Sequence, residues 1–461
     1  MLFNSTVFLE FFAAFLLLYF LWRKSLAARN LLILAASCLF YGWWDWRFLG
    51  LLLFSGCFDF GSGLLIGGTA NLRRRKVLLC LSLAVNLSLL GVFKYFDFFL
   101  GSLAALLSPL HLNLGTLGLI LPIGISFYTF QSLSYVIDVY RGQMEPTRSL
   151  VRYLAYVSFF PQLVAGPIER ARDLLPQFQR TLVIDNEMIV QGAWLIVWGL
   201  FKKVVVADNL APVVEMAFDN PSVTGPAVLC GALAFAFQIY GDFSGYSDIA
   251  RGLARVLGFK LSVNFNLPYI ATNLRDFWRR WHISLSSWLR DYLYISLGGN
   301  RNGDARTYLN VLLTMLIGGL WHGAAWNFVL WGAWHGAGLV ANRWWQQRFG
   351  RLPNWISWPL TFLFVLYGWI LFRAGSLQHV VKLTCAIPSW DAPVWLGNCL
   401  VNLAVLVGPL VAIEFWQKRA NDQLVAVAAR PCLLGFLQGG LLLAVVLFWE
   451  KKAVPFIYFQ F

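Results

Sequence analysis

Long apolar runs separated by short polar stretches recur along the whole chain. They cover residues 7–22, 30–44, 48–66, 77–93, 116–137, 153–167, 191–207, 223–241, 309–341, 356–372, 398–413 and 432–449. A helix needs about 20 largely apolar residues to cross a membrane, so this pattern predicts an all-α, multi-pass membrane protein. With short loops the chain has room for about 11 crossings (range about 9–13). The shorter runs predict interfacial or re-entrant helices, and 309–341 is long enough for two short helices.

Composition supports the same class of protein. Of 461 residues, 59% are hydrophobic and only 13% are charged, whereas soluble domains carry about a quarter charged residues. A soluble enzyme, a disordered protein and a coiled coil are therefore excluded. The net charge of +14 does not indicate nucleic acid, because the bases sit in loops where the positive-inside rule accounts for them. The expected surrounding is the lipid bilayer.

The position of the first basic residues predicts an orientation. Residues 1–22 contain no Lys or Arg, and Arg23, Lys24 and Arg29 follow the first apolar run. A secretory signal has its positive charge before the apolar core, so this run is expected to be a membrane helix with its start outside and the first loop in the cytoplasm. The loops with Arg73 and Arg141 fit the same alternation, which becomes ambiguous beyond residue 170.

Common signatures of soluble enzymes are missing from the sequence. The seven Cys residues have no C-x-x-C spacing and lie mostly within apolar runs, so neither a metal site nor a disulfide framework is expected. The sequence also lacks a Gly-x-Ser-x-Gly elbow, a Walker loop and an H-E-x-x-H motif. A serine hydrolase, an ATPase and a zinc protease are therefore not indicated.

Residues 242–301 form the longest polar stretch, and it is rich in aromatic residues. Two rows occur there at helical spacing: Trp278, Trp281, Leu285, Trp288 and Tyr292, and beside them Arg275, Arg279, His282, Ser286 and Arg290. This predicts one amphipathic helix on which His282 shares a face with three arginines. Either the arginines meet lipid phosphates at the interface, or they form an anion site for a phosphate-bearing donor.

The segment before this stretch, residues 238–248, ends an apolar run. Ser244 or Ser247 is positioned to cap a following helix. Asp248 lies three residues before Arg251, which suits an ion pair on one helix face. Asp242 stands at the end of a membrane segment, where a carboxylate is costly, and is therefore a candidate functional residue.

Two histidines lie inside the charge-free run between 308 and 342. Trp-His-Gly-Ala occurs twice, with His322 and His335 thirteen residues apart. On one continuous helix they would be turned by about 220° and would not share a face, unless the helix breaks near the glycines. A buried imidazole stays neutral, which is the form a general base needs. The alternative is that both histidines only hydrogen-bond helix carbonyls in a packed bundle.

Several motifs together resemble the membrane-bound O-acyltransferase (MBOAT) family, and within it the bacterial alginate O-acetylation branch. They are the string from Arg275 through His282 to Ile295, then Gly298-Gly-Asn-Arg301, Gly318-Gly-Leu-Trp-His322-Gly, Leu121-Pro-Ile-Gly-Ile-Ser-Phe-Tyr128, Ala165-Gly-Pro-Ile168 and Asp242-Phe-Ser-Gly-Tyr-Ser-Asp248. These blocks run in order from about residue 121 to 336.

The resemblance implies one domain, residues 1–461, whose helices form a ring with a thin centre. Residues 1–115 would be N-terminal helices, 116–345 the catalytic core and 346–461 C-terminal helices. Such proteins take an acyl group from a cytoplasmic thioester, in this branch acetyl-coenzyme A. They pass it across the bacterial inner membrane to a periplasmic acetyltransferase partner, which acetylates an exported polysaccharide. No permanently bound cofactor is expected.

The resemblance also implies roles for particular residues. His322 matches the family's catalytic histidine and His282 the second histidine of this branch. His322 would act as the base, and His282 would hydrogen-bond the thioester carbonyl or its oxyanion. Arg275, Arg279 and Arg290 would attract coenzyme A phosphates. The expected supporting residues are Asp242, Trp321, Asn327 and His335.

The resemblance is compatible with several acceptor polymers, because the same core serves acylation of alginate, cellulose, peptidoglycan and, more distantly, teichoic acid. Two other classes of function also remain: a transporter, and a scaffold subunit of an exopolysaccharide secretion complex. The scarce histidines flanked by tryptophan favour the enzyme over both.

Overall fold

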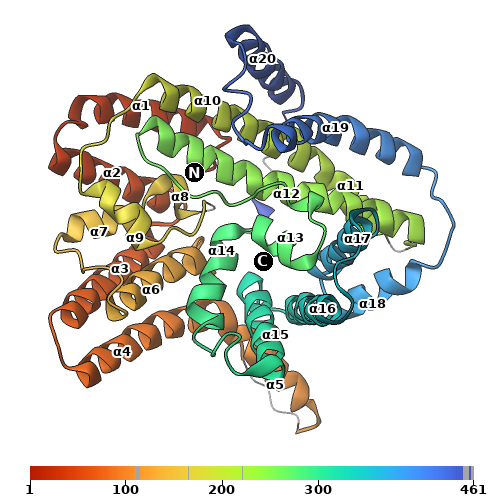
Figure 1. Cartoon of the computed structure of the whole chain (residues 1–461), viewed down its shortest axis with the longest axis horizontal. Coiled ribbons are helices and arrows are strands. Elements are labelled where there is room, and N and C mark those ends of the chain that lie inside the picture. Colours follow the sequence, from red (N-terminus) through yellow and green to blue (C-terminus); the bar gives the residue numbers. More distant parts are fainter. Residues whose placement is uncertain (111–114, 165, 221, 450–455, 458–461) are drawn as a thin grey trace. The chain divides into compact units, whose positions relative to one another are not determined.

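All regular elements in the described part of the chain are helices (Figure 1). The computed structural model describes residues 1–110, 115–164, 166–220, 222–449 and 456–457. The all-α prediction is therefore confirmed over these residues.

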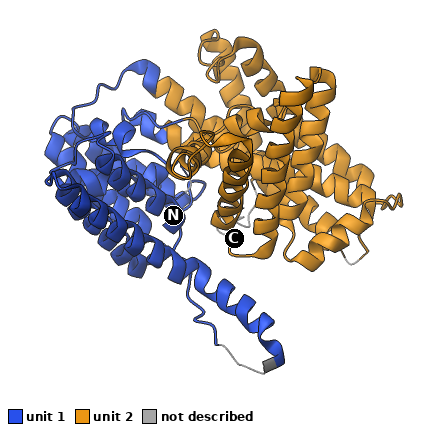
Figure 2. Cartoon of the chain, turned by 60° about the horizontal axis from the view of Figure 1, so that its bottom comes forward, with its two compact units in different colours: residues 1–188, 253–262 blue, residues 189–252, 263–461 orange. Residues whose placement is uncertain are grey.

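The chain divides into two compact units (Figure 2). Unit 1 comprises Met1–Met188 and Leu253–Ser262, and unit 2 comprises Ile189–Gly252 and Val263–Phe461. The helices up to residue 188 are α1 (Thr6–Trp22), α2 (Leu26–Gly42), α3 (Trp46–Gly67), α4 (Leu72–Leu90), the π-helix η1 (Gly91–Tyr95), α5 (Phe96–Leu106), η2 (Ser108–Leu110), α6 (Ile125–Tyr140), α7 (Leu150–Val157), α8 (Phe160–Leu163), α9 (Ala171–Leu174) and η3 (Leu175–Phe178). Those that follow are α10 (Asn186–Leu200), the π-helix η4 (Phe201–Ala207), α11 (Asp208–Phe218), α12 (Gly225–Val256), η5 (Pro268–Ile270), α13 (Leu274–Arg280), α14 (Ile283–Trp288), the π-helix η6 (Leu289–Tyr294), α15 (Gly303–His322), α16 (Trp326–Phe349), α17 (Asn354–Arg373), α18 (Leu377–Ala386), α19 (Leu396–Ala420) and α20 (Pro431–Leu447).

Six helical stretches in the described residues are long and apolar enough to cross a membrane. They are Trp46–Gly67, Leu72–Leu106, Asn186–Phe218, Gly225–Val256, Asn354–Arg373 and Leu396–Ala420. Three shorter apolar helices are α1, α2 and α20. The multi-pass character is thus confirmed, while the predicted count of about 11 crossings is not. One reason is that several apolar runs are divided: the run 153–167 contains the separate short helices α7 and α8.

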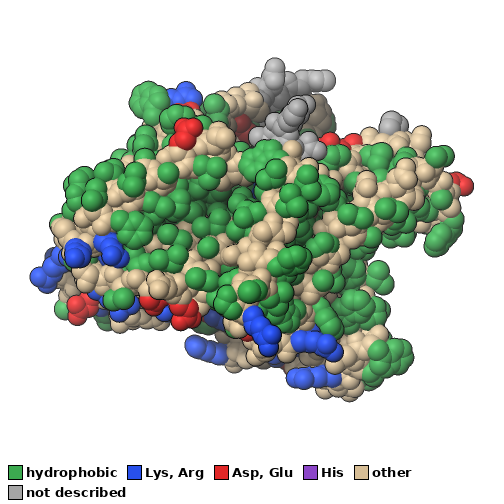
Figure 3. Space-filling view, turned by 90° about the horizontal axis from the view of Figure 1, so that it is seen from above, with side chains coloured by type: hydrophobic (Ala, Val, Ile, Leu, Met, Phe, Trp, Pro, Cys, Tyr) green, Lys and Arg blue, Asp and Glu red, His purple; other side chains and the backbone are tan. Residues whose placement is uncertain are grey.

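The surface is apolar, as expected for a protein solvated by lipid. Large apolar side chains such as Leu21 and Trp46 are exposed. On the face shown in Figure 3, hydrophobic side chains cover most of the area, and Lys and Arg side chains gather near its lower edge. An apolar surface bordered by basic side chains is what a bilayer with charged headgroups stabilises.

Several buried polar side chains of unit 1 have hydrogen-bond partners. The Asp59 carboxylate on α3 accepts hydrogen bonds from Ser82 Oγ at 2.7 Å and Asn86 Nδ2 at 2.9 Å, both on α4. Arg29, which the charge pattern had placed among cytoplasmic loop bases, is buried in α2 and donates to the backbone carbonyl of Arg180. Asp59 and Arg29 can therefore be buried in unit 1, because each of them has hydrogen-bond partners there.

Helices α15 and α16 form a tight antiparallel hairpin in unit 2, as the length of the run 309–341 allowed. At the crossing, a Cβ atom on Gly319 would lie 2.2 Å from the Phe328 carbonyl oxygen, and one on Gly332 would lie 2.4 Å from that of Met315. Only glycine permits backbones to approach this closely. The hairpin turn begins at Gly323, which is extended, so the break near the glycines is present and His322 and His335 lie on different helices.

Candidate active site

The helix predicted over Arg275–Tyr292 is interrupted, and His282 lies at the interruption. Helix α13 ends at Arg280 and α14 begins at Ile283, while His282 has the left-handed conformation (φ 43°, ψ 56°). The prediction of one continuous amphipathic helix is therefore wrong. Each short helix keeps the 3–4 spacing, but the turn between them rotates His282 away from the arginine row and buries it completely. A non-glycine residue in this conformation is strained, and such strain is characteristic of functional sites.

The His282 imidazole is held by a polar partner and enclosed by aromatic rings. Its Nδ1 lies 3.1 Å from Asn264 Oδ1. The Phe243 ring stands perpendicular to it at 4.6 Å between centroids. Burial lowers the pKa of His282, which lies between two helices too short to cross a membrane. The imidazole is therefore neutral.

His322 is the last residue of α15 and is 4% exposed. Its ring contacts those of Trp321, Trp331 and Phe372, with centroids 5.1, 5.0 and 5.4 Å away. The rings of His282 and His322 are 6.4 Å apart. The fold thus brings together two imidazoles that are forty positions apart in the sequence.

A narrow cavity of about 180 Å³ reaches His322, and we call it the inner pocket. Its walls are mainly apolar and come from the segment 278–294, from α15 and from α16; they include Trp278, Leu285, Leu289, Met315, Gly318, His322 and Trp331. The inner pocket is therefore suited to a thin, largely apolar chain whose end lies beside His322.

A second, larger cavity of about 620 Å³ has polar and basic walls. This arginine chamber is lined by Arg275, Arg290, Tyr294, Ile295, Asn300, Val311, Leu339, Asn342, Arg343, Gln346 and Gln347. Four of these residues, Arg290, Tyr294, Val311 and Leu339, also line the inner pocket. The two cavities are thus neighbours, with basic side chains in one and His322 in the other.

The arginines divide into two groups. Arg275 and Arg290 line the arginine chamber, joined there by Arg343 of α16, which the sequence analysis did not identify. Arg279 is not among the residues that line it. Arg275 and Arg279 both lie on α13, before the interruption at His282, so the interruption does not account for this difference. Arg343 pairs with Asp304 at 3.0 Å, and Arg290 pairs with Asp291 at 2.6 Å.

The expected supporting residues have different environments. Trp321 contacts both histidine rings. Asn327 donates to the Ala374 carbonyl at 2.8 Å and so joins the start of α16 to the end of α17. His335 is fully buried between Trp278 and Trp331, with centroids 5.2 and 4.8 Å away, behind the wall of the inner pocket.

Asp242 lies in a buried charged cluster. Its Oδ1 is 2.9 Å from Lys203 Nζ, which also pairs with Asp208 at 2.7 Å. Asp242 does not line either cavity, but the next residue, Phe243, contacts His282. Asp242 therefore belongs to an ion cluster that supports α12 beside the site.

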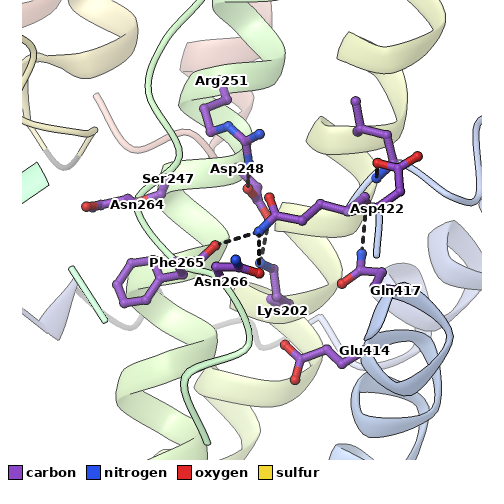
Figure 4. A network of polar contacts seen from close by, with 12 residues as sticks. Lys202, Ser247, Asp248, Arg251, Asn264, Phe265, Asn266, Glu414, Gln417 and Asp422 are labelled. Carbon is purple, nitrogen blue, oxygen red and sulfur yellow. Dashed lines mark hydrogen bonds and ion pairs between the residues drawn. The ribbon is translucent and has the colours of Figure 1, made fainter. Parts of the chain in front are cut away.

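A second ion cluster is centred on Asp248 (Figure 4). Its carboxylate pairs with Lys202 at 2.5 Å and with Arg251 at 2.8 Å, and Figure 4 shows these side chains beside Asn264 and Ser247. The predicted Asp248–Arg251 pair is confirmed. The capping role expected for Ser244 or Ser247 is wrong, because α12 continues through both residues to Val256. The apolar sequence around Lys202 did not indicate that this lysine pairs with Asp248.

The structure thus defines a polytopic α-helical membrane protein with a buried histidine pair and a cavity system that reaches it. The model of MBOAT, the membrane-bound O-acyltransferase family, matches residues 146–378. The chain belongs to this family and is an O-acyltransferase.

Several known proteins are similar to this chain over most of its length. It is 47% identical to "Probable alginate O-acetylase AlgI" of Azotobacter vinelandii, over 85% of this chain and 78% of that protein. It is 48% identical to the protein of the same name from Pseudomonas aeruginosa, over 82% and 73%. It is 38% identical to "Peptidoglycan O-acetyltransferase" of Helicobacter pylori, over 83% and 79%.

Proposed function

We propose that the protein takes an acetyl group from acetyl-coenzyme A in the cytoplasm and passes it across the bacterial inner membrane for O-acetylation of an exported polysaccharide. The observation that carries the proposal is the position of His322 in an apolar pocket beside a chamber with arginines. The shape of acetyl-coenzyme A matches these two cavities. Its thin arm carries the acetyl thioester, which suits the inner pocket, and its other end carries phosphates, which suit the arginine chamber. The names of the relatives support an acetyl group and a cell-envelope polymer.

The proposed reaction is attack of an acceptor hydroxyl on the thioester carbonyl. His322 takes the hydroxyl proton as the oxygen–carbon bond forms, the carbon–sulfur bond breaks, and the proton goes to the departing thiolate. Proton transfer by a positioned imidazole contributes typically 10²- to 10⁴-fold. An acyl-His322 intermediate would divide the same transfer into two steps. The Trp rings around His322 keep water from competing with the hydroxyl.

The final acetylation is assigned to a periplasmic acetyltransferase partner. Both compact units contain helices that are long and apolar enough to cross a membrane, and a polysaccharide needs an open, polar binding surface. Alginate is the first polymer to test because of the relatives with 47% and 48% identity. Peptidoglycan is the second candidate, favoured by the Helicobacter pylori relative.

Inverted membrane vesicles test this function directly. Acetyl-labelled coenzyme A is added outside, periplasmic extract is enclosed inside, and free thiol and labelled polymer are followed. We expect thiol release and label inside only when the protein and the extract are both present. Vesicles with His322→Ala protein serve as the blank. Release without extract would indicate hydrolysis or self-acylation. No release under any condition, with folded protein present, would contradict the proposal and favour a transporter or a scaffold.

The arginine chamber leads to a separate prediction about donor affinity. Replacing Arg275 and Arg290 together with glutamine should raise KM for acetyl-coenzyme A about 5- to 20-fold and leave kcat within about threefold, because charge-assisted hydrogen bonds to phosphates are lost. The wild-type KM should also rise with salt more steeply than that of the variant. Initial rates at several ionic strengths measure both effects.

Arg279→Gln is the matched control, because Arg279 belongs to the same helix as Arg275 but does not line the chamber. We expect its KM within about twofold of wild type. A rise equal to that of the double variant would show that the predicted arginine row, and not the chamber, recognises the donor.

A further inference from the structure

Asn264 contacts His282, one of the two paired histidines, although no sequence motif singled it out. It lies in the loop between α12 and α13, and its side chain is 1% exposed. Its backbone carbonyl accepts from Ile283 N at 2.9 Å. Its side chain lies within hydrogen-bond distance of His282 and of Ser284, the two residues that flank Ile283 in the sequence.

The orientation of the Asn264 amide is fixed by a backbone N–H group, which can donate a hydrogen bond but cannot accept one. The backbone N–H of Ser284 donates to Oδ1 at 3.2 Å, and the Ser284 hydroxyl donates to the same oxygen at 2.8 Å. On the other side, Asn264 Nδ2 donates to Ser247 Oγ at 3.3 Å, and Figure 4 shows these two residues adjacent. A backbone N–H only donates, so the atom facing Ser284 and His282 is the oxygen.

The orientation of the amide determines which nitrogen of His282 carries the proton. Oδ1 of Asn264 is an acceptor only, so the 3.1 Å contact with Nδ1 is a hydrogen bond in which Nδ1–H donates. The ring is fully buried against Phe243, which disfavours a second proton. A neutral imidazole protonated at Nδ1 has a lone pair at Nε2.

We infer that Asn264 is a positioning residue that holds His282 in the Nδ1-protonated tautomer, so that Nε2 of His282 is a proton acceptor in the acyl transfer. The role expected from the sequence resemblance was the opposite one, in which His282 donates a hydrogen bond to the thioester carbonyl. In this tautomer Nε2 has no proton to donate. His282 therefore accepts the proton that His322 has taken from the acceptor hydroxyl, and returns it to the thiolate sulfur as the carbon–sulfur bond breaks.

The tautomer can be measured without turnover, so this part of the test is independent of the proposed function. Protein containing ¹⁵N,¹³C-labelled histidine is placed in lipid bilayers, and nitrogen–carbon correlation spectra distinguish the two neutral tautomers. The His282 signal is assigned by its loss in His282→Gln. We expect the Nδ1–H form in wild type and in Asn264→Asp, whose carboxylate still accepts, and a changed tautomer population in Asn264→Leu. An Nε2–H form in wild type would overturn the inference.

Measurements of enzyme activity form the second part of the test, and this part rests on the proposed acetyl transfer. Asn264→Leu should lower kcat by about 10²-fold with KM within about threefold, because the tautomer is no longer fixed. Asn264→Asp should keep kcat within about tenfold and move the acidic limb of the pH profile of kcat/KM to higher pH, since a carboxylate favours imidazolium. An unmoved profile in Asn264→Asp would overturn the role of Asn264.

Asn310→Leu is the control for loss of a buried asparagine. Asn310 is fully buried in the same unit, and its Nδ2 donates to the Gly299 carbonyl at 2.9 Å. Its effect should be confined to stability, with the wild-type pH profile. Equal loss of kcat in Asn310→Leu and Asn264→Leu would reduce Asn264 to a structural residue. Failure of the proposed function would instead appear as absent transfer in wild type together with an intact Nδ1–H signal.

Discussion

Replacing His322 with alanine should lower acetyl transfer by about 10²- to 10⁴-fold, because the base that takes the hydroxyl proton is removed. KM for acetyl-coenzyme A should change little, since the arginine chamber is lined by other residues. His322→Gln should be nearly as inactive, because an amide fills much of the space of the imidazole without its basicity. Steady-state rates with purified protein in lipid, at saturating donor, measure the loss.

The control is His379→Ala, which removes a histidine outside the site. His379 lies in the first turn of α18, and its Nε2 is 3.0 Å from the Phe218 carbonyl. Its rate should stay within about threefold of wild type. A His322→Ala protein of wild-type melting temperature that still transfers acetyl at the wild-type rate would contradict the assignment of His322, and with it the proposed mechanism.

Adding one methyl group at Gly319 should destabilise unit 2 strongly. In Gly319→Ala the new Cβ would lie 2.2 Å from the Phe328 carbonyl oxygen and 3.1 Å from the backbone of Gly332. Backbone atoms cannot move aside as a flexible side chain can, so α15 and α16 must separate. Overpacking of this kind costs about 1–3 kcal/mol or more. His322 is one turn away on α15, so activity should fall as well.

Gly439→Ala in α20 is the matched substitution, because a Cβ there meets no atom within 4 Å. A helix interior favours alanine over glycine by about 0.5–1 kcal/mol, so its melting temperature should equal or exceed that of wild type. Thermal unfolding of both variants in the same detergent gives the comparison. If Gly319→Ala melts at the wild-type temperature, the close approach of the two helices is not what fixes the hairpin.

The repeat of apolar runs was sufficient to predict the helical, multi-pass class. Length and apolarity are local properties, and a bilayer requires them of each crossing helix separately. The hairpin over 309–341 was predictable for the same reason. So was the Asp248–Arg251 pair, because residues three apart on a helix are always neighbours. The ordered motifs around His282 and His322 identified the family without any knowledge of their distance.

The local pattern was misleading where the chain turns. Spacings of 3 and 4 continue through Trp278, Trp281 and Leu285 whether the chain is one helix or two short ones, so the left-handed residue at His282 left no trace in the sequence. Its conformation is unfavourable by itself. It is observed together with contacts to Asn264 and Phe243, which come from a preceding loop and from α12.

The amino-acid sequence alone thus determined the class of protein and the family, and it singled out the histidines that we expect to carry proton transfer. The tertiary structure decided which of them meet: Arg275 and Arg290 with Arg343 but without Arg279, and His282 with His322 and Asn264. The physical reason is that hydrophobic periodicity acts over one or two helical turns. The tautomer of a buried imidazole and the walls of a cavity instead depend on side chains that only packing of distant segments brings within a few ångströms.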